Sequence, residues 1–192
     1  MHTLHTTKAF VLQRYPQGES NFTYKLLTET LGLLYAHGQG VRELKSRNKY
    51  ALCVGQISII TLVKGREVWR ITGAQNENEC SNLSENPLYM RKILQLVGKM
   101  LPVEDDSEKV FKIVEECFNE SNKHDAETET VLETVTMFRL MDAFGFVARP
   151  IEEVTIAQFL DSEPISADLL TRATKYREAL VSRVNNALEE AK

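Results

Sequence analysis

Hydrophobic and polar residues alternate in short runs over the first third of the chain, and turn-forming residues separate these runs. The pattern predicts strands at residues 8–14, 22–27 and 31–37, a fourth within 50–63, and a last one at 67–72. In the last strand Trp69 and Ile71 share one face, and Arg70 lies on the other. Five short strands within about 70 residues favour a small closed barrel, because closure removes exposed strand edges.

The period becomes helical after a polar, aperiodic stretch at residues 73–85, GAQNENECSNLSE, which indicates a linker. Apolar residues then recur every three or four positions. This pattern predicts helices at residues 87–100, at 105–118 with Asp105 and Glu108 as a capping box, at 131–141 ending near Gly145, at 156–160, and at 166–188 with Ser166 as the cap. The predicted fold class is therefore α+β, a five-stranded β-barrel followed by an α-helical bundle.

Charge is distributed unevenly between these two parts. The whole chain has a net charge of −4, but residues 1–74 hold ten Lys and Arg against four Asp and Glu, a net +6. The remainder holds 13 basic and 23 acidic residues, a net −10. A basic first part favours a polyanionic ligand there, whereas the acidic second part repels the same ligand.

The densest run of positive charge lies in residues 38–49, GQGVRELKSRNK, between two predicted strands. Two glycines, of which Gly40 lies two residues before Arg42, allow the backbone to approach a ligand closely. Four cations follow within eight residues: Arg42, Lys45, Arg47 and Lys49. Cations so close repel one another unless a polyanion or counterions neutralise them, so we expect a phosphate-backbone site. A solvated connecting loop is the alternative.

Further cations lie on or beside the predicted strands, interleaved with aromatic residues. The cations are Arg14, Lys25, Arg66 and Arg70, and the aromatic residues are Phe22, Tyr24, Tyr35, Tyr50 and Trp69. Single-stranded nucleic acid binds to this combination by base stacking and phosphate pairing. Aromatic residues at a period of two also pack in cores. For Trp69 and Tyr24 the sequence distinguishes least well between packing in the core and stacking on bases.

Catalysis, metal binding and membrane insertion find little support in the sequence. The three cysteines, Cys53, Cys80 and Cys117, form no CxxC pair, and the four histidines have no partner at ligand spacing. No carboxylate pair is spaced for acid–base work, and no nucleophile or phosphate-loop motif is present. No run of eighteen apolar residues and no apolar leader occurs. We expect a soluble cytoplasmic protein without catalytic residues, cofactor or metal.

The segments AFVLQRYPQGES and LLTETLGLLYAHGQGVRELKS resemble the N-terminal part of RecO, the bacterial recombination mediator. MFRLMDAFGF, residues 137–146, is similar to a helix of that family. The resemblance implies an OB-type nucleic-acid-binding domain at 1–74, a linker at 75–86 and an α-helical domain at 87–192. It also implies a nucleoid-associated DNA-repair protein without enzymatic activity that binds single- and double-stranded DNA, anneals strands, and acts with RecR and single-strand binding protein to load RecA.

One feature departs from the family. Many RecO proteins carry a four-cysteine zinc module after that helix, whereas residues 148–162 contain no cysteine. The resemblance is therefore to a compact, zinc-free form. If the acidic tail of single-strand binding protein docks on the helical domain, its carboxylates need a cation beside an apolar pocket. Arg139, supported by Arg91 or Lys92, is the candidate, and the alternative is that Arg139 lies on an outer helix face.

Two other functions remain open on the sequence alone. The chain could be a protein-interaction adaptor whose barrel binds a peptide or protein surface, with the basic segment aiding solubility only. It could also be a metal-dependent nuclease, which would require clustered carboxylates.

Overall fold

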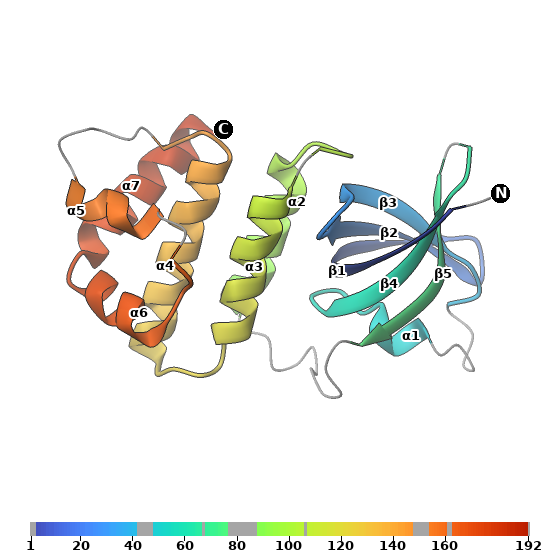
Figure 1. The fold of residues 1–192 in the computed structure, drawn as a ribbon, viewed down its shortest axis with the longest axis horizontal. Helices are drawn as coiled ribbons and strands as arrows, with labels where there is room; N and C mark the ends of the chain where they lie inside the picture. The colour runs from blue at the N-terminus through green and yellow to red at the C-terminus, as the bar shows by residue number, and fades with distance from the viewer. Residues whose placement is uncertain are drawn as a thin grey trace. The chain divides into compact units, whose positions relative to one another are not determined.

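The computed structural model describes residues 3–41, 48–66, 68–76, 88–105, 107–147, 154–160 and 163–191. The chain divides into two compact units, which are described separately below. The barrel unit comprises Met1–Asn86 and Leu94–Phe111, and the helical unit comprises Pro87–Ile93 and Lys112–Lys192. Figure 1 shows the strands of the first unit and the helices of the second. The α+β class is confirmed.

The barrel unit is a closed sheet in the strand order β1-β2-β3-β5-β4. Its elements are β1 (Leu4–Gln17), β2 (Asn21–Thr28), β3 (Gly32–Gly38), α1 (Asn48–Ala51), β4 (Ile57–Lys64) and β5 (Trp69–Asn76). Strands β3 and β5 pair in parallel, and the other pairs are antiparallel. A short helix between β3 and β4 and this strand order are those of an OB-type barrel.

The barrel interior follows from the alternation along the strands. Ala9, Val11, Tyr24, Leu26, Leu34, Ala36, Ile60, Leu62, Trp69 and Ile71 form one buried cluster with Val41 and Leu52. Arg70 is exposed on the other side of β5, as predicted. Each strand contributes alternate residues to this cluster because successive side chains point to opposite faces.

Strand β1 is longer than the sequence pattern predicts. Residues Tyr15, Pro16 and Gln17 pair with residues of β2, so the connection between the predicted strands 8–14 and 22–27 shrinks to the three residues 18–20. The pairing register shifts between Val11 and Gln13, which marks a β-bulge. A bulge bends its strand and increases the local twist, which allows a strand of fourteen residues to follow a small barrel.

Part of the barrel's outer surface is covered from within the same unit. The rings of Phe10 and Phe111 lie 5.5 Å apart between centroids, and Phe10 is fully buried although it lies outside the barrel core. Leu33 forms a bridge with Val103. Gly32 has a φ of +72°, and a Cβ there would lie 2.1 Å from the carbonyl oxygen of Asp105. The stretch Leu94–Phe111 therefore packs closely on β1 and the β2–β3 turn.

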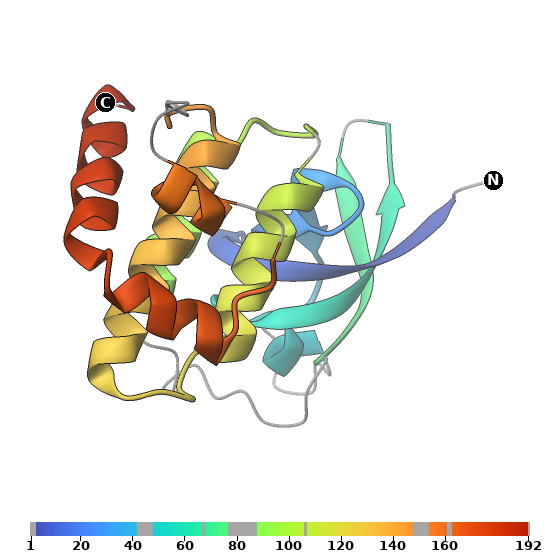
Figure 2. The same cartoon turned by 60° about the vertical axis from the view of Figure 1, so that its left-hand side comes forward.

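The helical unit is built around α4. The first part of α2 (Leu88–Met100) and most of α3 (Glu108–Glu120) belong to it, and the rest of both helices belongs to the barrel unit. Its other elements are α4 (Ala126–Ala143), α5 (Val154–Ala157), the 3-10 helix η1 (Gln158–Leu160), α6 (Ala167–Thr174) and α7 (Arg177–Glu190). Helices α6 and α7 and η1 pack against α4, and Figure 2 shows α6 and α7 beside it. None of the described helices is both long enough and apolar enough to cross a lipid bilayer.

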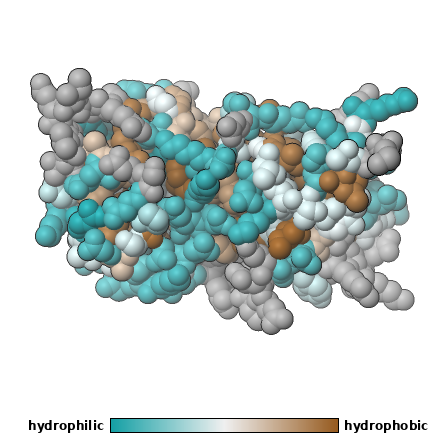
Figure 3. Space-filling view, viewed as in Figure 1, coloured by the Kyte–Doolittle hydropathy of each residue, from teal (hydrophilic) through white to brown (hydrophobic). Residues whose placement is uncertain are grey.

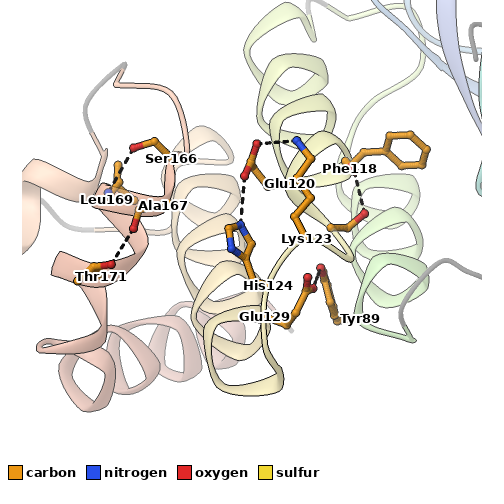
Figure 4. Close-up of polar contacts among 11 residues, drawn as sticks. Tyr89, Phe118, Glu120, Lys123, His124, Glu129, Ser166, Ala167, Leu169 and Thr171 are labelled. Carbon is orange, nitrogen blue, oxygen red and sulfur yellow. Dashed lines mark hydrogen bonds and ion pairs between the residues drawn. The ribbon is translucent and has the colours of Figure 1, made fainter.

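Local signals set several of these helix ends. The side chain of Asp125 accepts a hydrogen bond from the backbone N–H of Thr128, and that of Ser166 accepts one from Leu169, which Figure 4 shows. The predicted capping box is wrong, because α3 begins at Glu108 and Asp105 lies before its cap position. The predicted long last helix is also wrong. In place of one helix over 166–188 there are two, because α6 ends at Thr174 and α7 begins at Arg177.

Candidate nucleic-acid interface

The basic segment falls mostly outside the described residues. Arg42, Lys45 and Arg47 lie there, and for Lys49 only the backbone, in α1, is described. Gly40, which precedes them, has a φ of +64°, and its N–H donates a hydrogen bond of 2.9 Å to Asn21 Oδ1 at the start of β2. A positive φ favours glycine. Gly40 therefore bends the chain after β3 and fixes the start of the basic segment beside the β1–β2 turn.

An outer face with exposed side chains crosses β1, β2, β3 and β5. In the strand registers Tyr15 pairs with Thr23, Thr23 with His37, and His37 with Arg70, so these side chains form one row on one face. Tyr35 lies two residues before His37 and on the same face. We call Tyr15, Thr23, Tyr35, His37 and Arg70 the aromatic–basic face.

Two tyrosine rings are exposed on this face. Tyr15 is 44% exposed and Tyr35 is 39% exposed, and their ring centroids lie 6.5 Å apart. The Thr23 hydroxyl lies 3.0 Å from His37 Nδ1, so a hydrogen bond links the two residues in the middle of the row. Rings that stay exposed beside cations are available for stacking. Tyr15 and His37 are not among the site residues expected from the sequence, whose local pattern assigns Tyr15 to a turn.

Arg70 and Arg66 supply the exposed cations near this face. Arg70 ends the row on β5, and Arg66 lies in the β4–β5 connection. Both side chains are exposed. Within the described ranges neither forms a salt bridge with another side chain. As exposed cations without a salt bridge to any described side chain, both are candidates for pairing with an anion.

Lys25 faces the same side but is already bonded. It lies between Gln13 and Tyr35 in the strand registers. Its ammonium donates a hydrogen bond to the carbonyl of Gly98 in α2 and lies 5.4 Å from the centroid of the Tyr35 ring. Lys25 therefore lies beside the Tyr35 ring with one of its three N–H donors already bonded to Gly98, and its role as a phosphate contact stays a prediction.

Arg14 lies apart from the aromatic–basic face. It pairs with Tyr24, whose side chain is in the barrel core, and its guanidinium carbon lies 5.1 Å from the centroid of the Phe22 ring. Burial raises the pKa of Tyr24 to about 12, an effect that the nearby Arg14 charge partly offsets. The structure therefore does not bring Arg14 together with Arg70.

Tyr24 and Trp69 are core residues and offer no stacking surface. Tyr24 is fully buried, and Trp69 packs in the same cluster. The indole N–H of Trp69 donates a hydrogen bond to Glu104 Oε1 at 3.1 Å. Of the five aromatic residues proposed from the sequence, Tyr50 is largely exposed and Tyr35 is partly exposed.

The partner-binding role expected for Arg139 is wrong, because Arg139 is an internal residue of the helical unit. Its side chain is 5% exposed. Arg139 Nε donates to the carbonyl of Phe159 at 2.8 Å, and one terminal nitrogen donates to the carbonyl of Glu163 at 2.7 Å. The other terminal nitrogen lies 3.2 Å from Glu116 Oε2. The guanidinium thus links three segments and cannot receive a partner's carboxylate.

Arg91 and Lys92 are exposed on α2 and remain candidates for partner docking. A second polar cluster lies near the α3–α4 connection, where Glu120 accepts from Lys123 and lies 3.1 Å from His124 Nε2 (Figure 4). These contacts lower the pKa of Glu120 despite its partial burial. Glu120, Lys123 and His124 pair with one another at the connection between α3 and α4, so their charges already have partners.

Among the described residues, no group of three or more His, Cys, Asp or Glu side chains is arranged to hold a metal ion. Comparison with known proteins gives no matching family model and no similar curated protein.

Proposed function

We propose that the barrel unit binds single-stranded DNA across its aromatic–basic face, and that the protein is a non-enzymatic recombination mediator similar to RecO. The observation that carries the proposal is the pair of exposed rings, Tyr15 and Tyr35, in the same patch as His37 and Arg70. Base stacking on such rings contributes about 1–3 kcal/mol per base and tolerates any sequence.

The position of this face within the barrel supports the proposal. OB-type barrels bind oligonucleotides on the outer surface of the second and third strands, between the β1–β2 and β4–β5 loops. Here Tyr35 and His37 lie on β3, Thr23 lies on β2, and Arg66 lies in the β4–β5 connection. The basic segment begins beside the β1–β2 turn through the bond between Gly40 and Asn21. The Arg66 side chain and the described start of the basic segment, Gly40, thus lie in the loops that border this surface.

The mediator role rests on the resemblance of the sequence to RecO. In this role the protein also binds double-stranded DNA, RecR and single-strand binding protein. It promotes strand annealing and the loading of RecA on DNA. Because Arg139 is bonded internally, Arg91 and Lys92 are the cations we assign to partner docking.

A specific feature favours the adaptor function as the second candidate. Leu4, Val68 and Val103 are exposed apolar residues. Leu4 begins β1 opposite Val63, and Val68 directly precedes Trp69, which pairs with Lys64. Figure 3 shows hydrophobic residues among polar ones at the surface of the barrel. Exposed apolar residues grouped at one end of a barrel are a feature of protein-binding surfaces.

Fluorescence anisotropy with a labelled single-stranded oligonucleotide separates the two functions. We expect saturable, salt-sensitive binding, weakened about tenfold or more in a Tyr15→Ala/Tyr35→Ala variant that loses two stacking rings. Arg42→Ala/Lys45→Ala/Arg47→Ala should weaken binding and reduce its salt dependence. Leu4→Ala is the matched control, since it removes an exposed residue at the other end of β1. No binding by the unchanged protein up to high micromolar concentration would refute the DNA function and favour the adaptor.

A further inference from the structure

A pocket of about 540 Å³ lies on another part of the barrel, at the outer face of β1, β4 and β5 beside α1. Its lining includes Thr6, Tyr50, Ile59, Thr61, Gln75 and Asn76. Figure 1 shows α1 at the end of the barrel where β5 finishes. Pockets that bind small organic groups have volumes of about 300–1,000 Å³, so this one can accept a ring system.

The strand registers explain why this surface is hollow. Thr6 pairs with Thr61, and Thr61 pairs with Gly73, so one cross-strand row ends in a residue without a side chain. The Thr6 and Thr61 hydroxyls lie 3.3 Å apart and form a polar floor. Tyr50, which is 71% exposed, stands at the rim because α1 packs against β5.

The lining residues that the structure describes are uncharged and offer both hydrogen bonds and a ring. Asn76 Oδ1 is buried and has no hydrogen-bond partner in the described part of the chain. Gln75 adds a second side-chain amide, and the two threonines add hydroxyls. Side-chain amides pair with the donor and acceptor edges of nucleobases, and an exposed tyrosine ring provides a stacking surface. A planar, uncharged, hydrogen-bonding group matches this lining better than an anion does.

The sequence places the pocket next to a backbone-binding segment. Tyr50 follows directly on Arg42–Lys49, the run that holds four cations. Because Tyr50 is the next residue in the chain, a strand whose phosphates pair with those cations has its bases within reach of the Tyr50 ring. We propose that this pocket binds one unstacked nucleobase of the bound single strand, a second contact separate from the aromatic–basic face. This inference rests on the proposed function.

The test compares DNA binding by the variants Tyr50→Ala and Tyr50→Phe. It uses a set of single-stranded oligonucleotides, each with the fluorescent base 2-aminopurine at a different position. Loss of one stacked base corresponds to about tenfold weaker binding. We expect this loss for Tyr50→Ala with an unchanged salt dependence, since no phosphate contact is removed. Tyr50→Phe keeps the ring and should bind like the unchanged protein. One 2-aminopurine position should change its emission on binding to the unchanged protein and to Tyr50→Phe, but not to Tyr50→Ala.

The outcomes are distinguishable. If the unchanged protein binds DNA and Tyr50→Ala binds equally well with the same 2-aminopurine emission, the pocket assignment is overturned and the DNA function stands. If the unchanged protein does not bind DNA, both fail. Tyr50 is largely exposed, so its replacement should leave folding intact, and the emission of Trp69 in the barrel core verifies this.

Discussion

Trp69 Nε1 donates a hydrogen bond to Glu104 Oε1 at 3.1 Å, which joins the first residue of β5 to the segment before α3. The same carboxylate lies 3.3 Å from Lys64 Nζ. The Glu104 N–H also donates to the Leu33 carbonyl at 2.7 Å. Glu104 has a φ of +59°, so it holds an unfavourable backbone conformation while making these bonds. Glu104 therefore fastens the stretch Leu94–Phe111 to the barrel, with its carboxylate bonded to β4 and β5 and its backbone N–H bonded to β3.

This link should make the barrel sensitive to acid. The hydrogen bond from Trp69 and then the contact with Lys64 lower the pKa of Glu104 below its ordinary value. A carboxyl group with a lowered folded-state pKa stabilises the fold above its unfolded pKa of about 4.3, and that contribution disappears as pH falls through the folded value. Trp69 is the only tryptophan in the sequence, so its emission should change in this range.

The variant Glu104→Gln keeps an acceptor for Trp69 but cannot titrate. We expect the acid step in Trp69 emission to disappear in this variant. Glu29→Gln, in the β2–β3 turn, is the control and should retain the step. An unchanged titration in Glu104→Gln would show that another group causes it.

Gly32→Ala should destabilise the barrel more than Gly18→Ala. Both glycines have positive φ, +72° and +62°, so both replacements introduce backbone strain of about 1–3 kcal/mol. A Cβ at Gly32 also meets the Asp105 carbonyl oxygen at 2.1 Å, whereas nothing lies within 4 Å of one at Gly18. Urea denaturation of the two variants gives the difference. Equal destabilisation by the two replacements would contradict the close packing of Leu94–Phe111 on the β2–β3 turn.

Replacing Arg139 by methionine should lower the free energy of unfolding by about 3 kcal/mol or more. The replacement leaves the Phe159 and Glu163 carbonyls without their hydrogen-bond donor, and Glu116 without its charge partner. Arg91→Met, at an exposed position, should change it by less than about 0.5 kcal/mol. Chemical denaturation followed by far-UV circular dichroism measures both. A small effect of Arg139→Met would mean that the buried network contributes little to stability.

Arg66 and Arg70 should each pair with one phosphate group of the bound strand. The slope of log K against log salt concentration for a single strand should become shallower by about 0.7 for each phosphate pairing that is removed, so Arg66→Ala/Arg70→Ala should reduce it by about 1.4. Arg177→Ala, at the exposed start of α7, removes a charge from the helical unit and should leave the slope unchanged. Equal slopes in the double variant and the unchanged protein would exclude these arginines from the interface.

The sequence was least informative where a side chain has two possible environments. Lys25 and Arg139 are both long cations in periodic segments, and such residues usually face solvent. Lys25 instead bonds to Gly98, 73 residues away, and Arg139 bonds to segments 20 and 24 residues away. The helix break before Arg177 has no glycine or proline to mark it. There Tyr176 packs against Phe159, with ring centroids 5.8 Å apart.

By itself the sequence determined the closed barrel of five strands, the helices that follow, and the division of β5 into a buried and an exposed face. It could do so because the period of apolar residues is a local property that decides which side of an element is buried. Only the tertiary structure decided which cations stay available, that Tyr15 joins Tyr35 on one face, and that Thr6, Thr61 and Gly73 form the floor of a pocket. These depend on strand register and on contacts between residues distant in the chain, which no local pattern specifies.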